Sequence, residues 1–215
     1  MMKRIRQIMM LGGLLAFAIS HAGPMGFGRS WMAMGDLGPN WRDTWVNYAL
    51  TSRDAVGGGY LYMRSDDKTK NRELAEATYT RLLKRWNMPS AQANVWFVGG
   101  LGAMRGNDFD GTKFVYTPGL QADYETTRIH FGGAARVYRA SAIKHDFLSA
   151  RTGFSFYEAE YDKTQPWLIL EARHMRGLSD KVEITPMLRL VNKRFFIEGG
   201  VSNNRDVRFN FMYIF

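Results

Sequence analysis

The sequence contains no cysteine, and after its first 22 residues it has no long apolar run. Without disulfides, the stability of the fold must come from another source, such as closed ladders of strand hydrogen bonds. The longest apolar candidate, Val95 to Met104, falls well short of the roughly 20 residues that a membrane-spanning helix requires. Spanning helices are therefore excluded here, whereas spanning strands are not, because each strand gives only a weak hydropathy signal.

Runs of basic residues are also missing, although the chain has a formal net charge of +9. Three of the basic residues lie within residues 1–22, so the rest of the chain carries +6, and this charge is dispersed. A nucleic-acid-binding surface would normally gather its Lys and Arg, so no nucleic-acid partner is expected. The sequence has neither a phosphate-binding glycine loop nor a zinc-spaced His/Cys set, so we expect no cofactor and no metal.

The N-terminus has the three parts of a secretory signal peptide. Lys3, Arg4 and Arg6 precede the apolar run from Ile8 to Ile19, which ends in Ser20-His21-Ala22. A basic head, a short apolar middle and small residues before the cut are typical of such signals. Cleavage after Ala22 would leave Gly23 to Phe215 as a single domain. The alternative, a membrane anchor helix, is disfavoured because the apolar run is short.

The C-terminal segment alternates in character from residue to residue. Val207, Phe209, Phe211, Tyr213 and Phe215 fall on one side of a strand, and polar Arg208 and Asn210 fall on the other. An alternating aromatic strand that ends on Phe resembles the assembly signal of bacterial outer-membrane β-barrels. This resemblance implies a location in the outer membrane of a Gram-negative bacterium, contact with outer-membrane lipid, and recognition by the barrel-assembly machinery.

Turn-like clusters recur along the chain at intervals that fit short antiparallel strands. The predicted strands are 25–34, 43–51, 56–64, 72–85, 92–104, 114–125, 127–141, 150–161, 166–174, 181–191, 194–201 and 207–215. The sequence thus predicts an all-β protein, a transmembrane antiparallel up-and-down barrel of about 12 strands, or of ten if the first pair does not form. Gly57-Gly58-Gly59 suggests a bulge that switches the faces of its strand.

The connections between these strands differ in length on the two sides of the predicted membrane. With the C-terminus in the periplasm, 65–71, 105–113, 142–148 and 175–180 lie outside, and the shorter breaks at 52–54, 125–126 and 192–193 lie inside. Longer outer loops and shorter inner turns are typical of outer-membrane barrels.

Counting alternate residues assigns one face of the strands to lipid and the other to the lumen. The predicted lumen-lining residues are Arg128, His130, Arg136, Glu158, Glu160, Glu171, Arg173, Glu183, Arg189, Arg194, Glu198 and Arg208. A soluble β-sandwich would instead turn the apolar face inward and these charges into water. The signal peptide, the terminal Phe and the aromatic residues near strand ends favour the membrane barrel.

The leading functional hypothesis is a narrow channel for ions or small solutes with a mixed Arg/Glu lumen. A barrel of about twelve strands lies between the filled eight-stranded kind and the open sixteen-stranded porins. The first alternative is a sealed barrel with a structural or surface-interaction role.

The second alternative is a lipid-modifying enzyme of the outer membrane. Candidate groups lie near the predicted outer rim: Ser141, His145, Asp146, Ser149, His174, Ser179 and Asp180. Catalysis would require a serine hydroxyl within reach of a histidine, and the chain shows no diagnostic spacing. A soft-metal role for Met25, Met32 and Met34 is a weaker idea, because methionine on a strand wall ordinarily serves as packing.

Overall fold

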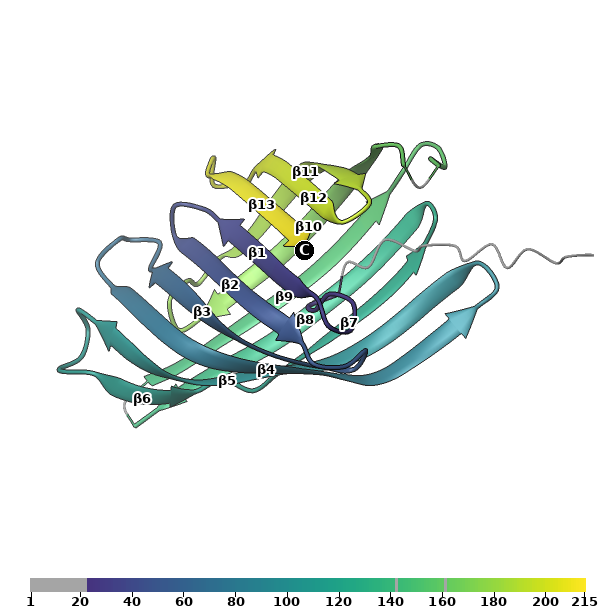
Figure 1. The fold of residues 1–215 in the computed structure, drawn as a ribbon. Helices are drawn as coiled ribbons and strands as arrows, with labels where there is room; N and C mark the ends of the chain where they lie inside the picture. The colour runs from purple at the N-terminus through teal and green to yellow at the C-terminus, as the bar shows by residue number, and fades with distance from the viewer. Residues whose placement is uncertain (1–22, 142, 161) are drawn as a thin grey trace, which may run out of the picture.

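The computed structural model describes residues 23–141, 143–160 and 162–215, which form thirteen strands in one antiparallel sheet (Figure 1). The strands are β1 (Trp31–Leu37), β2 (Trp41–Ala49), β3 (Asp54–Arg64), β4 (Asn71–Met88), β5 (Ala91–Gly106), β6 (Lys113–Tyr116), β7 (Gly119–Thr126), β8 (Ile129–Ala140), β9 (Ile143–Phe154), β10 (Gln165–Arg176), β11 (Val182–Asn192), β12 (Phe195–Val201) and β13 (Val207–Ile214). Within the described ranges there is no helix long and apolar enough to cross a membrane. The signal-peptide prediction for residues 1–22 lies outside these ranges.

The sheet closes into a barrel because its first and last strands pair. β1 and β13 are joined by an antiparallel ladder, and the other strands pair with their neighbours along the chain, except that β6 and β7 do not pair with each other. β6 and β7 both lie between β5 and β8 and share one position in the wall. The predicted all-β, antiparallel barrel of 12 strands is therefore confirmed, with one wall strand broken into two pieces.

The break between β6 and β7 lies at Thr117-Pro118. Proline has no backbone N–H and cannot continue a hydrogen-bonded ladder. The carbonyl of Pro118 still accepts a hydrogen bond from the backbone N–H of Val137 at 3.0 Å, so the wall remains closed there. The Thr117 side chain is fully buried in the interior.

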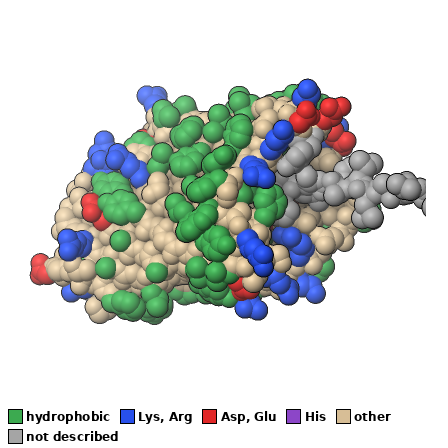
Figure 2. Space-filling model, viewed as in Figure 1, with side chains coloured by type: hydrophobic (Ala, Val, Ile, Leu, Met, Phe, Trp, Pro, Cys, Tyr) green, Lys and Arg blue, Asp and Glu red, His purple; other side chains and the backbone are tan. Residues whose placement is uncertain are grey.

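Side chains alternate between an apolar outer face and a polar inner face. Leu101, Leu120, Leu148 and Val201 are each more than half exposed on the outside, whereas Arg208 on the inside is 1% exposed. On the face shown in Figure 2, apolar side chains form a band across the wall, with Lys and Arg side chains on either side of it. This distribution is the reverse of a soluble barrel and is typical of barrels that cross a membrane.

The barrel wall is uneven in height. β4 has 18 residues and β5 has 16, whereas β1 and β12 have seven each. The β4–β5 hairpin extends beyond the rest of the wall at the right of Figure 1. We call the end where β1 begins and β13 ends the inner end, and the opposite end the outer end.

The ninth strand differs from its prediction by seven residues. The segment 143–148, predicted as an outer loop, begins β9, and the predicted strand residues 155–160 belong to the connection between β9 and β10. Lys144 and Asp146 suggested a loop, but they alternate with buried Ile143 and His145 and point outward at the outer end of the strand. Charge at a strand end is compatible with a membrane barrel, because its cost falls toward the interface.

The prediction of a bulge at Gly57-Gly58-Gly59 is wrong. β3 pairs with both neighbours in unbroken register, and the register shift lies instead in β4 between Leu82 and Lys84. A Cβ atom on Gly57 would come within 2.2 Å of the carbonyl oxygen of Val46. This glycine therefore permits a close approach of two backbones and leaves the faces of β3 unchanged.

Three apolar clusters fill much of the interior. One lies at the outer end and contains Trp41, Leu61, Met63, Leu74, Met104, Val115, Tyr138, Ile143, Met175 and Leu178. Two lie at the inner end: Met32, Trp167, Ile169, Met187, Val191, Phe196, Met212 and Ile214, and Met25, Ala49, Ala55, Leu82 and Trp96. The polar groups of the interior lie between these ends.

Candidate functional site: the barrel interior

Most of the predicted lumen-lining residues lie on the inner face of the wall. These are His130, Arg136, Glu171, Arg173, Glu183, Arg189, Glu198 and Arg208. Four others do not lie on the wall, and their assignment to the lumen is corrected: Arg128, Glu158, Glu160 and Arg194.

The four misplaced residues lie in exposed connections at the inner end. Arg128 precedes β8, and its guanidinium donates to the carbonyl oxygens of Ser155 and Phe156. Glu158 and Glu160 lie in the long β9–β10 connection, and Arg194 lies in the tight β11–β12 turn. Alternation cannot identify such residues, because the strand pattern continues in the sequence beyond the last paired residue.

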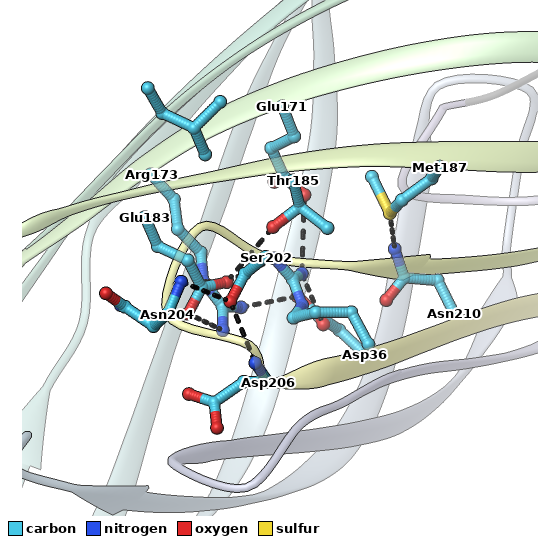
Figure 3. A network of polar contacts seen from close by, with 12 residues as sticks. Asp36, Glu171, Arg173, Glu183, Thr185, Met187, Ser202, Asn204, Asp206 and Asn210 are labelled. Carbon is cyan, nitrogen blue, oxygen red and sulfur yellow. Dashed lines mark hydrogen bonds and ion pairs between the residues drawn. The ribbon is translucent and has the colours of Figure 1, made fainter.

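A network of arginines and carboxylates covers the inner face of β1 and β9–β13. Figure 3 shows the part of it around Asp36, Arg173 and Glu183. Its members are Asp36, Arg151, Glu171, Arg173, Glu183, Arg189, Glu198 and Arg208. We call this set the arginine–carboxylate network. It contains four guanidinium groups and four carboxylates, so it is formally neutral.

Arg208 lies at the centre of this network. One guanidinium nitrogen, Nη2, is 2.7 Å from Asp36 and 3.3 Å from Glu171, and the other, Nη1, is 2.9 Å from Glu183. Its side chain is 0% exposed. A buried charge with this many partners holds several strands in one arrangement, and removing it would leave uncompensated carboxylates behind.

Glu198 is the second point where the network converges. It accepts hydrogen bonds from Arg151 and Asn210 at 2.7 Å each, and from Arg189. The Glu198 side chain is fully buried. These contacts join β9, β11, β12 and β13 on the inside of the barrel.

A smaller polar group lies across the interior from this network. Arg136 on β8 donates to Glu76 on β4 at 2.7 Å and to Thr117 at 2.7 Å. The hydroxyl of Thr117 in turn donates to Glu76 at 2.7 Å. The proline-induced break therefore positions a hydroxyl that completes this ion pair.

Asp43 on β2 lies beside these charges but has no partner of its own. Its neighbour across the β1–β2 ladder is Asp36, which is paired with Arg173 and Arg208. Among the described residues, none forms a hydrogen bond or ion pair with the Asp43 carboxyl. That carboxyl lies on the wall of a central cavity.

The central cavity has a volume of about 210 Å³, large enough for several water molecules. Five carboxyl groups and three guanidinium groups line it: Asp36, Asp43, Glu76, Asp123, Glu171, Arg136, Arg151 and Arg189. Carboxyl groups are thus in excess around the cavity, although the arginine–carboxylate network as a whole is neutral.

The inner end of the cavity is covered by the segment that precedes β1. The sequence predicted a strand over 25–34, but β1 begins at Trp31. Met25 is 1% exposed and packs against Ala49, Leu82 and Trp96. The side-chain amide of Asn47 donates to the carbonyl oxygen of Pro24 at 2.9 Å. Residues 23–25 are therefore buried in the inner mouth, whereas residues 27–29 are exposed, and we call the segment 23–30 the inner plug.

The outer end is bridged by two loops from opposite sides of the wall. Four wall positions separate β3 from β11 in one direction, and four separate β4 from β10 in the other. Ser179 in the β10–β11 loop donates to Asp66 in the β3–β4 loop at 2.6 Å, and Leu178 packs into the outer apolar cluster. We call this contact the outer bridge.

The β3–β4 loop is held in shape by its own side chains. The hydroxyl of Ser65, and the backbone N–H and hydroxyl of Thr69, all donate to the Asp67 carboxylate. These bonds lower the pKa of Asp67 from 3.8 to about 2. Asp67 is therefore ionised at neutral pH and keeps the loop that carries Asp66 in its turn.

The histidines proposed for an enzyme lie apart. His145 points inward, with its ring 5.1 Å from Tyr138 and 6.4 Å from Trp41 between ring centroids. Neither of its ring nitrogens has a hydrogen-bond partner in the described part of the chain. His174 lies on the opposite, outward face of β10, beside Leu148 of β9. The enzyme hypothesis gains no support from this geometry.

The three methionines proposed for soft-metal contact are also separated. Met25 packs in one inner apolar cluster, and Met32 and Met34 pack in or against the other. Each has ordinary apolar neighbours, as expected of packing residues.

Sequence reasoning missed several inward charges. Asp36 and Asp43 flank Gly38-Pro39-Asn40, which is a turn signal between two alternating runs and could have located the β1–β2 hairpin. Arg151 lies within the predicted strand 150–161, but assigning Glu158 and Glu160 to the lumen placed it on the opposite face. Glu76 was missed because neither phase of β4 keeps both Glu76 and Arg81 away from lipid; the structure turns Glu76 inward and Arg81 outward, where it pairs with Asp54.

A closed wall, an apolar outer face and a charged interior together decide the class of this fold. It is a transmembrane-type β-barrel. This class agrees with the general assignment from the C-terminal strand.

Comparisons with known proteins give likenesses of shape. No family model matches the chain, and no curated protein matches it. A solved KdgM porin is 14% identical with a TM-score of 0.48, covering 86% of this chain and 98% of that one. KdgM porin in complex with disordered oligogalacturonate is 13% identical, with a TM-score of 0.46 and coverage of 86% and 98%. A loop-deletion mutant of OmpT, an outer membrane protein of Vibrio cholerae, is 9% identical, with a TM-score of 0.30 and coverage of 86% and 97%.

Proposed function

We propose that the protein is a narrow channel for small cations in the outer membrane of a Gram-negative bacterium, closed at both ends in this conformation. The central cavity is the conducting site, and its excess of carboxyl groups favours cations over anions. The inner plug and the outer bridge are the two closures that must open for solute to pass.

The observation that carries this proposal is Asp43. Its side chain is partly exposed to the cavity, and no described residue forms a hydrogen bond or ion pair with its carboxyl. A barrel that served only as a scaffold would have no use for an unpaired carboxyl at this position. In a channel the same unpaired carboxyl supplies a site for a passing cation, which its neighbours Asp36 and Glu76 cannot supply because arginines already neutralise them.

Ion flux from sealed vesicles tests the proposal. Purified protein reconstituted into vesicles loaded with K⁺ should release it faster than protein-free vesicles. Cl⁻ loaded into the same vesicles should be released more slowly than K⁺. Vesicles that hold folded protein and lose neither ion would argue against any channel.

The second candidate is a sealed barrel with a structural role. The apolar clusters at the two ends favour it, since their buried side chains fill much of the interior on either side of the cavity. A channel would conduct current once one closure is weakened, whereas a sealed barrel would remain silent.

A further inference from the structure

Three cationic side chains gather on the outward face of the wall, at the outer end of β8, β9 and β10. Arg139 of β8 is the ladder partner of Lys144 of β9, and Arg176 of β10 is the ladder partner of Asp146, two residues further along β9. We call Arg139, Lys144, Asp146 and Arg176 the outer cationic patch. It is separate from the barrel interior, because these residues point away from it.

Among the described residues, Asp146 is the one carboxylate that pairs with any of these three cations. Arg139 is ion-paired with Asp146, and Arg176 lies 3.9 Å from the same carboxylate. Lys144 is exposed and has no polar partner among the described residues. The patch therefore carries a net charge of +2 on three adjacent strands. Like charges on neighbouring strands repel, so an additional anion would stabilise this arrangement.

Arg139 is already held in position. Its guanidinium donates to the carbonyl oxygens of Tyr138 at 3.0 Å and His145 at 2.8 Å. By contrast, the side chain of Arg176 is 79% exposed. One oriented guanidinium and two exposed cationic groups suit an anion with several oxygens, because part of the site is already ordered before it binds.

The surface next to the patch, toward the middle of the wall, is mainly apolar. Leu148, two residues along β9 from Asp146, is 59% exposed; its outward ladder partners are Ala135 of β8 and His174 of β10, and Ala150 follows it on β9. On a barrel wall, Lys or Arg is costly at the bilayer midplane and costs little near the interface. The patch thus lies at headgroup depth, with lipid-facing side chains beneath it.

Three outward arginines on other strands at this end have contacts with protein groups. Arg42 lies over the ring of Tyr62 at 5.4 Å, and the side chain of Arg64 donates to Asn40 at 3.0 Å. Arg105 donates to the hydroxyl of Thr112 at 3.0 Å. The outer cationic patch differs from them because its three cations lie on adjacent strands around one carboxylate.

We infer that the outer cationic patch binds the phosphate groups of a lipid in the outer leaflet, with the acyl chains of that lipid against Leu148 and Ala135. This inference rests on the proposed membrane location but not on the channel. A phosphorylated headgroup matches the charge of the patch, and the adjoining apolar surface selects a lipid over free phosphate.

Thermal unfolding in detergent micelles tests this inference without any measurement of current. A ligand that binds the folded barrel raises its unfolding temperature. Diphosphoryl lipid A added to the micelles should raise the temperature at which the compact gel band of the wild type is lost. The double variant Lys144→Gln/Arg176→Gln should need at least about tenfold more lipid for the same shift, as expected when charge-assisted contacts are lost.

Controls separate binding from folding and lipid from phosphate. Lys163→Gln removes one cation in the β9–β10 connection at the inner end and should respond to the lipid like the wild type. The single variant Arg176→Gln should show an intermediate response, and each variant must migrate as a compact band without lipid. An equal shift in wild type and double variant would overturn the site. A full shift with inorganic phosphate alone would overturn the lipid as its occupant.

Discussion

Asp36 and Asp43 are ladder partners on β1 and β2, yet only Asp36 is paired with arginine. Asp36 belongs to the neutral arginine–carboxylate network, and Asp43 faces the cavity alone. The same residue type thus has two environments within one hairpin. Asp36 therefore belongs to the part of the interior that stabilises the barrel, whereas Asp43 belongs to the part that can contact a solute.

Replacing Asp43 tests its role in selectivity. Asp43→Asn keeps the shape of the side chain and removes its charge, so cation preference should fall, and the reversal potential under a salt gradient should move toward zero. Because Asp43 has no ion pair to lose, stability should change by less than about 1 kcal/mol. An unchanged reversal potential would remove Asp43 from the conducting path.

Removing Arg208 tests the arginine–carboxylate network. Arg208→Ala leaves Asp36, Glu171 and Glu183 without their shared partner. Breaking a buried ion pair by deleting one member costs about 3–5 kcal/mol, so the midpoint of urea unfolding should fall clearly. Arg194→Ala, in an exposed turn, should change the unfolding free energy by about 0.5 kcal/mol or less. Equal midpoints for the two variants would contradict a structural role for the network.

The inner plug can be weakened at Met25. Met25→Ala removes a nearly fully buried side chain from the cluster with Trp96, and truncating a buried methionine costs about 2–5 kcal/mol. The plug should then leave the mouth more often, and single-channel open probability should rise. Phe27→Ala, which truncates a half-exposed side chain of the same segment, is the matched control and should have a smaller effect.

The sequence predicted the architecture well and the interior only in part. Strict alternation in 182–192 and 207–214 located β11 and β13 and their inward charges Glu183, Arg189 and Arg208, because these strands carry one apolar and one polar face. Alternation failed in β9, where Glu158 and Glu160 set the wrong phase, and in β4, where the outward Arg81 left the phase undecided. It also cannot show which inward charges pair, since Asp36 and Arg173 lie 137 residues apart.

The ionisation of Asp67 gives a pH prediction for the outer loop. Its pKa is lower in the folded protein, at about 2, than the ordinary value of 3.8. Its contribution to stability is therefore fully present above about pH 4 and is lost as the pH falls toward 2. Asp67→Asn should destabilise the outer bridge at pH 7, and this difference from the wild type should vanish near pH 2. Hydrogen exchange of the backbone amides of residues 65–70 measures the stability of this loop. A difference between Asp67→Asn and the wild type that persists at pH 2 would contradict a role for the ionised Asp67 carboxylate.

Single-channel recording in a planar bilayer, with purified protein under a KCl gradient, tests the central claim most directly. A closed but openable channel predicts rare current steps in the wild type, frequent steps in Met25→Ala, and a reversal potential of the sign that favours K⁺. Folded protein that stays silent in both forms at every voltage would contradict the account and leave a sealed barrel.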